Sequence, residues 1–227
     1  MTGMGVSIML SDIAIGVVGH IDRQRQIRYL TREINPEVIE VDDGTLGAAG
    51  NHAATLLALS RTDADWLVLL EDDALPVKNF RYQIGQALEV APSHLVSFYL
   101  GTGYPQQWQG RIVDALREDT CWIMCDRLLH GVCYAVHHDR VDSLVVRIMD
   151  LSQRRYGTDD AISKWALENG VPVSYSSVSQ VDHEDSASVH GVRYALGHPT
   201  HPRNRPRHAH KVGICNTWTA SACTMGR

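Results

Sequence analysis

The sequence predicts a single α/β domain in which helices flank a mostly parallel central sheet. Two observations support this prediction. Apolar, β-branched segments alternate with segments of helical spacing over about sixty residues from residue 13 onward, and this order is typical of parallel strands joined by right-handed crossovers. The chain also has 227 residues, 44% of them hydrophobic, which suits one full-sized domain with its own core.

The first three predicted strands alternate with two predicted helices. Residues 13–20 (IAIGVVGH) form a β-branched run and predict a buried strand. Residues 21–34 have apolar side chains spaced for one helix face, and an Asn-Pro pair ends that helix. Residues 38–41 predict a second short strand. A glycine-rich turn then leads into a helix through 51–60, and WLVLLEDD at 66–73 predicts the third strand.

The rest of the chain continues the alternation and then changes in composition. The predicted elements are a loop and helix over 76–92, a strand over 94–101, a connector over 111–119, strands within 121–136, helices over 141–151 and 158–170, and a strand-like run over 171–181. Thr158 is the predicted N-cap of its helix, and Gly170 marks the C-terminal end. We therefore predict a domain over 1–198, with its core from about residue 12, and a Pro/His/Arg-rich tail or flap over 199–227.

Composition excludes several classes of partner. The net charge of −5 gives no general attraction to nucleic acid or to an anionic membrane. No window approaches the roughly 18 unbroken apolar residues of a membrane span. An odd number of cysteines, five, without framework spacing is typical of a reducing cytoplasm. Cys121 and Cys125, with His137 and His138 downstream, match no strong zinc pattern, so buried thiols are the favoured interpretation.

Three adjacent carboxylates end the third predicted strand. Glu71, Asp72 and Asp73 repel one another, and they lie where open α/β sheets place ligands. Carboxylate oxygens there suit Mg²⁺ or Mn²⁺ bridging substrate phosphates. Neighbouring strand residues point to opposite sides, so the three carboxylates cannot all bind one ion directly. We assign Asp73 as a metal ligand, and we assign Asp72 as a contact to a substrate sugar or to a bound water. Glu71, grouped with the metal site, supports the strand end. The alternative is a solvated acidic turn.

These segments resemble a known family. DWLVLLEDDALPVKNF resembles the Asp-x-Asp segment of GT-A glycosyltransferases, above all those similar to glycosyltransferase family 25. The preceding GTLGAAGNHAATLLAL resembles that family's glycine-rich turn and its helix with an Asn-His near the start. YGTDDAISKWALENGVPV and QVDHEDSASVHG resemble later family segments, although Val181 and Asp182 separate Gln180 from His183. The resemblance covers about residues 13–191 and is closest to a compact bacterial or phage version.

The resemblance implies a GT-A fold, a nucleotide-sugar donor, with UDP favoured, and a divalent ion, Mn²⁺ or Mg²⁺. A cation between carboxylates and diphosphate would relieve their repulsion and stabilise charge on the leaving group. The implied reaction moves the sugar to a hydroxyl of a saccharide or protein acceptor. There are two alternatives. One is a sugar nucleotidyltransferase, which would have a Gly-rich, basic signature after the first strand that VVGHIDRQRQ lacks. The other is an inactive sugar-binding relative. A metal phosphohydrolase would need more dispersed His and Asp ligands.

Donor-binding candidates lie after the first two strands and at the following helix. A carboxylate after the second strand, Asp42 or Asp43, could accept hydrogen bonds from a base or ribose, and glycines before Asn51 allow close backbone approach. Neither a G-x-G-x-x-G nor a P-loop motif is present. The donor-binding candidates are Gly19, His20, Arg23, Asp43, Asn51 and Asp72. Ordinary loop polarity, a solvated helix start for Arg23 and an N-cap for Asn51 are the structural alternatives.

The remaining candidates concern catalysis, the metal and the acceptor. Asp159 or Asp160, with Asp160 preferred, is the predicted general base of an inverting enzyme, although both could serve only the helix dipole. His183, with His190 as runner-up, is the candidate metal ligand after the Asp motif. Tyr104 and Trp108 could stack on an acceptor or pack in the core. The tail cations Arg203, Arg205, Arg207 and Lys211 could contact diphosphate, but a solvated basic end is favoured.

Overall fold

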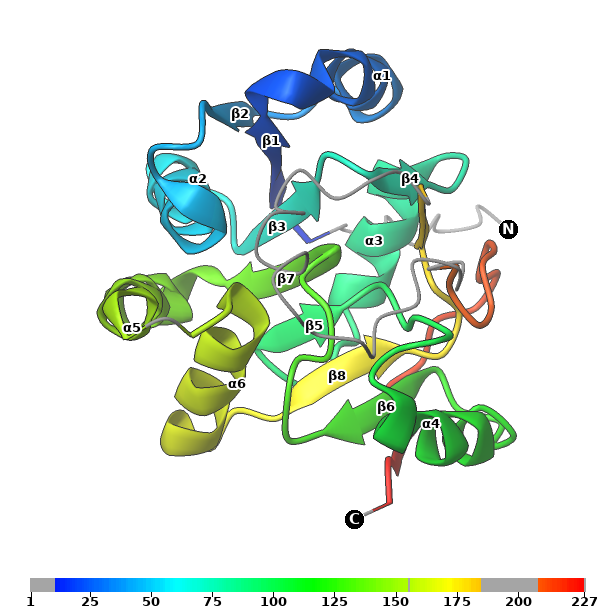
Figure 1. Ribbon diagram of the computed structural model, residues 1–227. Coiled ribbons are helices and arrows are strands. Elements are labelled where there is room, and N and C mark those ends of the chain that lie inside the picture. The colour runs from blue at the N-terminus through cyan, green and yellow to red at the C-terminus, as the bar shows by residue number, and fades with distance from the viewer. Residues whose placement is uncertain (1–10, 155, 185–207, 227) are drawn as a thin grey trace.

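The structure is a computed structural model, and it describes residues 11–154, 156–184 and 208–226. Within these residues the chain forms a mixed α/β domain around an eight-stranded sheet in the order β10-β6-β8-β5-β7-β3-β1-β2, with a separate two-stranded sheet of β4 and β9 (Figure 1). The strands are β1 (Ile13–His20), β2 (Val38–Asp42), β3 (Trp66–Glu71), β4 (Ala74–Pro76), β5 (Leu95–Ser97), β6 (Trp122–Cys125), β7 (Cys133–His137), β8 (Val173–Ser176), β9 (Val181–His183) and β10 (Ala222–Thr224).

Helices connect most of these strands. They are α1 (Gln24–Ile34), α2 (Gly47–Leu59), α3 (Phe80–Leu88), α4 (Gln109–Ala115), α5 (Val141–Gln153) and α6 (Thr158–Asn169), with short 3-10 turns η1 (Ile21–Arg23), η2 (Gln106–Trp108) and η3 (His138–Arg140). No helix among the described residues has the length and apolar character that crossing a membrane requires.

The predicted parallel arrangement of the first three strands is confirmed. β1 lies between β2 and β3 and runs parallel to both. The β5–β8 and β6–β10 pairs are also parallel, whereas β7 runs antiparallel to its neighbours β3 and β5, and β6 runs antiparallel to β8. The predicted α/β class with a mostly parallel sheet therefore holds, with β6, β7 and β10 running opposite to the other strands.

Helices cover both faces of the sheet and form two core layers. In Figure 1, α2, α5 and α6 lie along one side of the sheet and α3 lies on the opposite side. Leu56 from α2 and Ile162 from α6 are fully buried in one layer. Leu30 from α1 and Ile84 from α3 are fully buried in the other. Burying each such side chain stabilises the folded state by about 1.5–3 kcal/mol. The two layers therefore fix the sheet, including the edge that carries the candidate site.

Two glycines in β1 let helices approach the sheet closely. A Cβ atom on Gly16 would lie 2.6 Å from Thr55 Cγ2 of α2. A Cβ atom on Gly19 would lie 2.7 Å from Ile27 Cδ1 of α1. Gly19, predicted to contact the donor, is thus required here for the packing of α1 against the strand.

Several predicted boundaries differ from the structure. The strand expected over 94–101 is only β5, because the chain after Ser97 leaves the ladder. The connector expected over 111–119 begins as helix α4. Thr158 is the first helical residue and Gly157 is the N-cap, with no side-chain cap bond. Propensity patterns place helix ends poorly because caps depend on local geometry.

The described end of the chain differs from the predicted tail or flap. Within 208–226, β10 pairs in parallel with β6 and extends the sheet. The Trp122 indole N–H donates to the Thr219 carbonyl at 2.9 Å, and the Trp122 and Trp218 rings lie 5.4 Å apart. A three-residue strand has no detectable periodicity, and its pairing depends on a partner about 100 residues earlier. These described residues are therefore part of the folded domain.

Candidate functional site

The predicted carboxylates lie at the carboxyl ends of the parallel strands β1 and β3. Glu71 is the last residue of β3, and Asp72 and Asp73 form the turn that leads into β4. The Asp72 amide donates to the Val18 carbonyl at 3.1 Å, which joins this turn to β1. The sheet therefore fixes the backbone of the acidic segment, as expected for a ligand site at this edge.

A buried arginine supplies positive charge to two of these carboxylates. Arg23 Nη1 lies 2.8 Å from Asp73 Oδ2 and 3.3 Å from Asp72 Oδ1, and Arg23 is only 6% exposed. The other oxygen of Asp72 accepts the His20 backbone N–H at 2.8 Å. Asp72 and Asp73 are thus bound by Arg23, and Asp72 also by the His20 backbone N–H. The acidic turn is therefore not a solvated one.

Burial governs the protonation of this pair. Burial, with the neighbouring charges of Asp73 and Glu71, raises the pKa of Asp72 to about 6, although Arg23 and the His20 N–H oppose that rise. Burial and the charge of Glu71 also raise the pKa of Asp73, against the opposing effects of His183 and Arg23. Arg23 therefore compensates these carboxylates only in part, and a further cation would favour their ionised forms.

His183 reaches Asp73 through the small second sheet. β4 and β9 are antiparallel, and Ala74 pairs with His183. The Glu184 amide donates to the Asp73 carbonyl at 2.8 Å, and His183 Nε2 lies 3.4 Å from Asp73 Oδ2. Asp73 Oδ1 and His183 Nδ1 are buried and have no hydrogen-bond partner among the described residues. The structure thus brings together these two predicted metal ligands.

Glu71 has partners that were not predicted from the sequence. His52 Nε2 lies 3.4 Å from Glu71 Oε1, and His52 Nδ1 lies 3.1 Å from the Tyr134 hydroxyl. Because a carboxylate only accepts, the His52 ring directs an N–H at Nε2 toward Glu71. Burial would raise the pKa of Glu71, but the hydrogen bond and charge of His52 outweigh it and lower the pKa. The Asn-His at the start of α2 was the sequence feature that could have identified His52.

Asp159, and not the preferred Asp160, faces this cluster. A Cβ atom on Gly131 would lie 2.8 Å from Asp159 Oδ1 and 3.2 Å from Glu71 Oε1, so both carboxylates converge on one glycine. Burial, with the charges of Glu71 and Asp160, raises the pKa of Asp159 to about 8, although a hydrogen bond from the Gly131 backbone opposes the rise. Asp160 is exposed to solvent. The first turn of α6 thus directs one of its two carboxylates toward the site.

The predicted donor residues after β2 have structural partners. Asp42 accepts from the backbone N–H groups of Leu46 and Gly47, both at 2.9 Å. Burial would raise the pKa of Asp42, but these hydrogen bonds lower it. Asp43 is exposed and accepts from the Thr45 amide at 3.1 Å. Asp42 therefore anchors the start of α2, and Asp43 remains available to solvent.

His20 ends strand β1, and Asn51 of α2 contacts the same end of that strand. Asn51 lies inside α2 rather than at its N-cap, and its Nδ2 donates to the Gly19 carbonyl at 2.8 Å. Asn51 Oδ1 is buried without a partner in the described part of the chain. His20 Nδ1 accepts the Asp22 amide at 3.2 Å. Asn51 therefore joins α2 to β1, and its Oδ1 is enclosed in the protein.

The candidate residues for acceptor binding and those in the predicted tail differ in how exposed they are. Trp108 is 9% exposed and belongs to the core, with Arg111 and Arg127 over its ring at 5.0 and 5.3 Å. Tyr104 is 57% exposed, so only it presents a ring to solvent. Lys211 is exposed. His190, Arg203, Arg205 and Arg207 lie outside the described residues.

Asp73 and His183 carry donor atoms of the types that a divalent ion binds, and their 3.4 Å contact joins His183 Nε2 to the Asp73 oxygen that Arg23 also holds. A partnerless carboxylate oxygen and an imidazole nitrogen are suitable ligands for Mn²⁺, and their lack of protein partners is unusual for buried polar atoms. Glu71 instead pairs with His52. Two surface cavities of about 460 and 480 Å³ lie elsewhere, beside α5 and α6 and beside α4 and β6, and neither is lined by these carboxylates.

Comparisons with known proteins leave the family open. No protein-family model matches the chain, and no curated protein matches it. Among solved structures, the crystal structure of A197 from STIV is similar at 14% identity and a TM-score of 0.43, over 78% of this chain and 86% of that chain. We take neither a family nor a function from this likeness.

Proposed function

We propose that the protein is a divalent-metal-dependent glycosyltransferase that transfers a sugar from a nucleotide-sugar donor to a hydroxyl group. One observation carries the proposal: two carboxyl groups in different environments converge at one sheet edge. Asp73 lies beside His183 with a buried oxygen that lacks a described partner, and Asp159 lies beside Glu71 with a raised pKa. Carboxyl groups whose environments differ in this way can take separate roles.

Asp73 and His183 would hold the metal ion. When bound, Mn²⁺ or Mg²⁺ supplies Lewis-acid stabilisation for negative charge on a diphosphate leaving group. Asp73 is fixed by Arg23 and by the β4–β9 pairing, so its free oxygen is oriented before a ligand arrives. Arg23 would keep Asp72 and Asp73 together while the diphosphate binds, and Asn51 would hold the end of β1 beside the donor through its bond to the Gly19 carbonyl.

Asp159 would act as the general base that takes the proton from the acceptor hydroxyl. A catalytic base works best when its pKa lies near the working pH, and the pKa of Asp159 is raised to about 8. Glu71 stays ionised because His52 lowers its pKa, and its negative charge strengthens the basicity of Asp159. This assignment applies to an inverting enzyme.

The proposal is tested by thermal melting of the purified protein with UDP, GDP, CDP and ADP, each with and without Mn²⁺. A ligand that binds only the folded state raises the melting temperature by mass action, by an amount equivalent to about 2.7 kcal/mol at 100 times its dissociation constant. We expect one nucleotide, UDP, to raise the melting temperature only when Mn²⁺ is present. No metal-dependent rise with any nucleotide would overturn the proposal.

A further inference from the structure

A second group of possible metal ligands lies at the opposite end of the sheet. His137 is the last residue of β7, and His94 directly precedes β5. The two strands are antiparallel, and the His137 amide donates to the His94 carbonyl at 3.0 Å. Asp139 follows in η3. Because Trp66 at the start of β3 pairs with His137, β3 separates this group from Glu71 by roughly 17 Å, at about 3.3 Å per residue.

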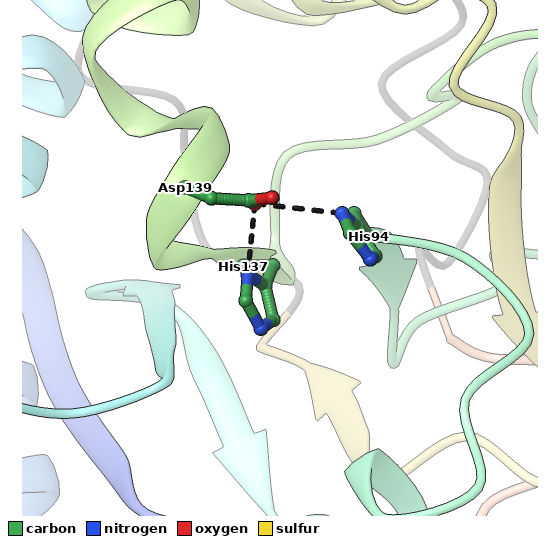
Figure 2. Close-up of side chains that lie close together, drawn as sticks. All are labelled: His94, His137 and Asp139. Carbon is green, nitrogen blue, oxygen red and sulfur yellow. Dashed lines mark hydrogen bonds and ion pairs between the residues drawn. The ribbon is translucent and has the colours of Figure 1, made fainter.

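The two imidazole rings face one carboxylate oxygen. His137 Nδ1 lies 2.8 Å from Asp139 Oδ1, and His94 Nδ1 lies 3.4 Å from the same atom. Figure 2 shows both rings directed toward the carboxylate of Asp139. Among residues 11–154, 156–184 and 208–226, these three residues form a group in which one ligand atom of each lies within 4.8 Å of the others.

The spacing suits a tetrahedral ion. Zinc binds imidazole nitrogen and carboxylate oxygen at about 2.0–2.2 Å, so ligands at a tetrahedral angle lie about 3.4 Å apart. The His94–Asp139 distance already has this value. His137 Nδ1 and Asp139 Oδ1 are hydrogen-bonded at 2.8 Å, so replacing the proton between them with a metal ion requires these atoms to separate by about 0.6 Å. A small side-chain movement is therefore enough.

The surroundings hold the rings but leave the group open. The Trp66 ring packs edge-on against His137 at 5.2 Å and against His94 at 6.4 Å, and the two imidazoles stack at 4.6 Å. The side chains of His94, His137 and Asp139 are 44%, 31% and 47% exposed. An ion can thus enter from solvent, and water can complete its coordination.

A guanidinium group already occupies part of this space. Arg140 Nε donates to His94 Nδ1 at 3.2 Å and lies 3.6 Å from Asp139 Oδ1. His94 Nδ1 is therefore an acceptor with its lone pair directed at a cation, which is the state a metal ligand requires. Arg140 is 42% exposed and can turn into solvent. Its charge would oppose a bound metal ion.

We propose that His94, His137 and Asp139 form a binding site for a divalent transition metal of the zinc type, with water in the fourth position. Two imidazoles and one carboxylate are a donor set that suits zinc and the neighbouring first-row ions better than Mg²⁺ or Ca²⁺. The site shares no residue with Asp73 and His183, so it is independent of the proposed transferase function.

The test is titration of the EDTA-treated, full-length protein with Zn²⁺ by isothermal calorimetry. His94→Gln, His137→Gln and Asp139→Asn should each abolish one binding event or weaken it by about 10-fold or more, the scale seen even for residues that only orient ligands. His138→Gln is the matched control, because the His138 ring bonds the Ser60 carbonyl at 3.1 Å instead. It should bind Zn²⁺ as the unsubstituted protein does.

Arg140→Gln should change the Zn²⁺ affinity in the opposite direction, because it keeps all three proposed ligands. Removing the guanidinium charge should tighten Zn²⁺ binding by at least a few-fold. Circular dichroism in EDTA confirms that each variant is folded. The proposal fails if His94→Gln and His137→Gln bind Zn²⁺ with unchanged stoichiometry and affinity. It also fails if only Asp73→Asn loses the binding event.

Discussion

Asp159 and Asp160 are adjacent in the sequence, but their environments give them different chemistry. Asp159 meets Glu71 across Gly131, and its pKa is raised to about 8 by burial and by the charges of Glu71 and Asp160. Asp160 is exposed. The sequence could identify an acidic helix start but not which carboxyl group points inward, because that depends on where α6 packs.

Asp159→Asn should change how stability depends on pH. The folded-state pKa of about 8 lies above the ordinary aspartate value of 3.8, so between these values the folded state binds a proton that the unfolded state lacks. The free energy of unfolding therefore falls as pH rises through this window, and the loss is complete above about pH 8. Urea denaturation in EDTA at pH 5 and pH 8 should show a smaller fall for Asp159→Asn. Asp114→Asn, on an exposed carboxylate paired with Arg117, is the control.

The same variant should affect transfer but not donor binding. Removing a general base lowers turnover by about 100-fold or more, whereas the Mn²⁺-dependent shift with nucleotide should persist. Normal turnover in Asp159→Asn, together with a loss in Asp160→Asn, would move the base to the exposed carboxylate.

Asp73→Asn should abolish metal-dependent nucleotide binding and leave the protein folded. The amide removes the negative charge that a divalent ion needs, while Arg23 keeps Asp72 as its partner at 3.3 Å. The measurement is the melting shift with UDP and Mn²⁺. Asp114→Asn, on an exposed carboxylate paired with Arg117, is the control. An unchanged shift in Asp73→Asn would contradict the metal assignment.

Gly131→Ala should disturb both carboxylates of the proposed base site. Its Cβ atom would lie 2.8 Å from Asp159 Oδ1 and 3.2 Å from Glu71 Oε1. Overpacking of this kind costs about 1–3 kcal/mol, and turnover should fall because Asp159 is displaced. Gly110→Ala is the control, since nothing lies within 4 Å of a Cβ atom there, and alanine in helix α4 should add about 0.5–1 kcal/mol. Chemical denaturation measures both effects.

The contact between β1 and α2 depends on one missing side chain. Gly16→Ala would place a Cβ atom 2.6 Å from Thr55 Cγ2 and 2.9 Å from Leu59 Cδ1. We expect a loss of about 1–3 kcal/mol in the free energy of unfolding, with α2 shifted away from the strand. Because α2 carries His52 and Asn51, nucleotide binding should weaken as well. A variant as stable as the original protein would show that this packing adapts freely.

The second sheet shows how a short element positions a functional group. β4 and β9 have three residues each, and their pairing sets His183 against Asp73. Only a family resemblance connects these residues in the sequence, because the pairing joins segments more than 100 residues apart. In contrast, β1, β2 and β3 were predictable from their apolar runs, since buried parallel strands need apolar side chains on both faces.

Residues 208–226 contribute to the stability of the domain, although their composition predicted a tail. A chain that stops after Arg207 would lose β10, the Thr219 carbonyl that accepts from Trp122, and the Trp218 ring beside it. Trp122 is fully buried, so exposing it should lower the free energy of unfolding by up to about 3 kcal/mol, the scale for one large apolar side chain. Denaturant unfolding of the truncated and full chains measures this. Equal midpoints would restore the prediction of a separate tail.

The amino-acid order was enough to predict the α/β class, the first three parallel strands and the acidic segment at the end of β3. These features follow from local periodicity and from the position of polar residues after apolar runs. Long-range packing decided the partners of each carboxylate: Arg23 and His183 for Asp73, His52 for Glu71, and Gly131 for Asp159. It also decided that His94 and His137 meet at Asp139. Such contacts join residues far apart in the chain, so strand register and helix docking determine them, and no local pattern contains either.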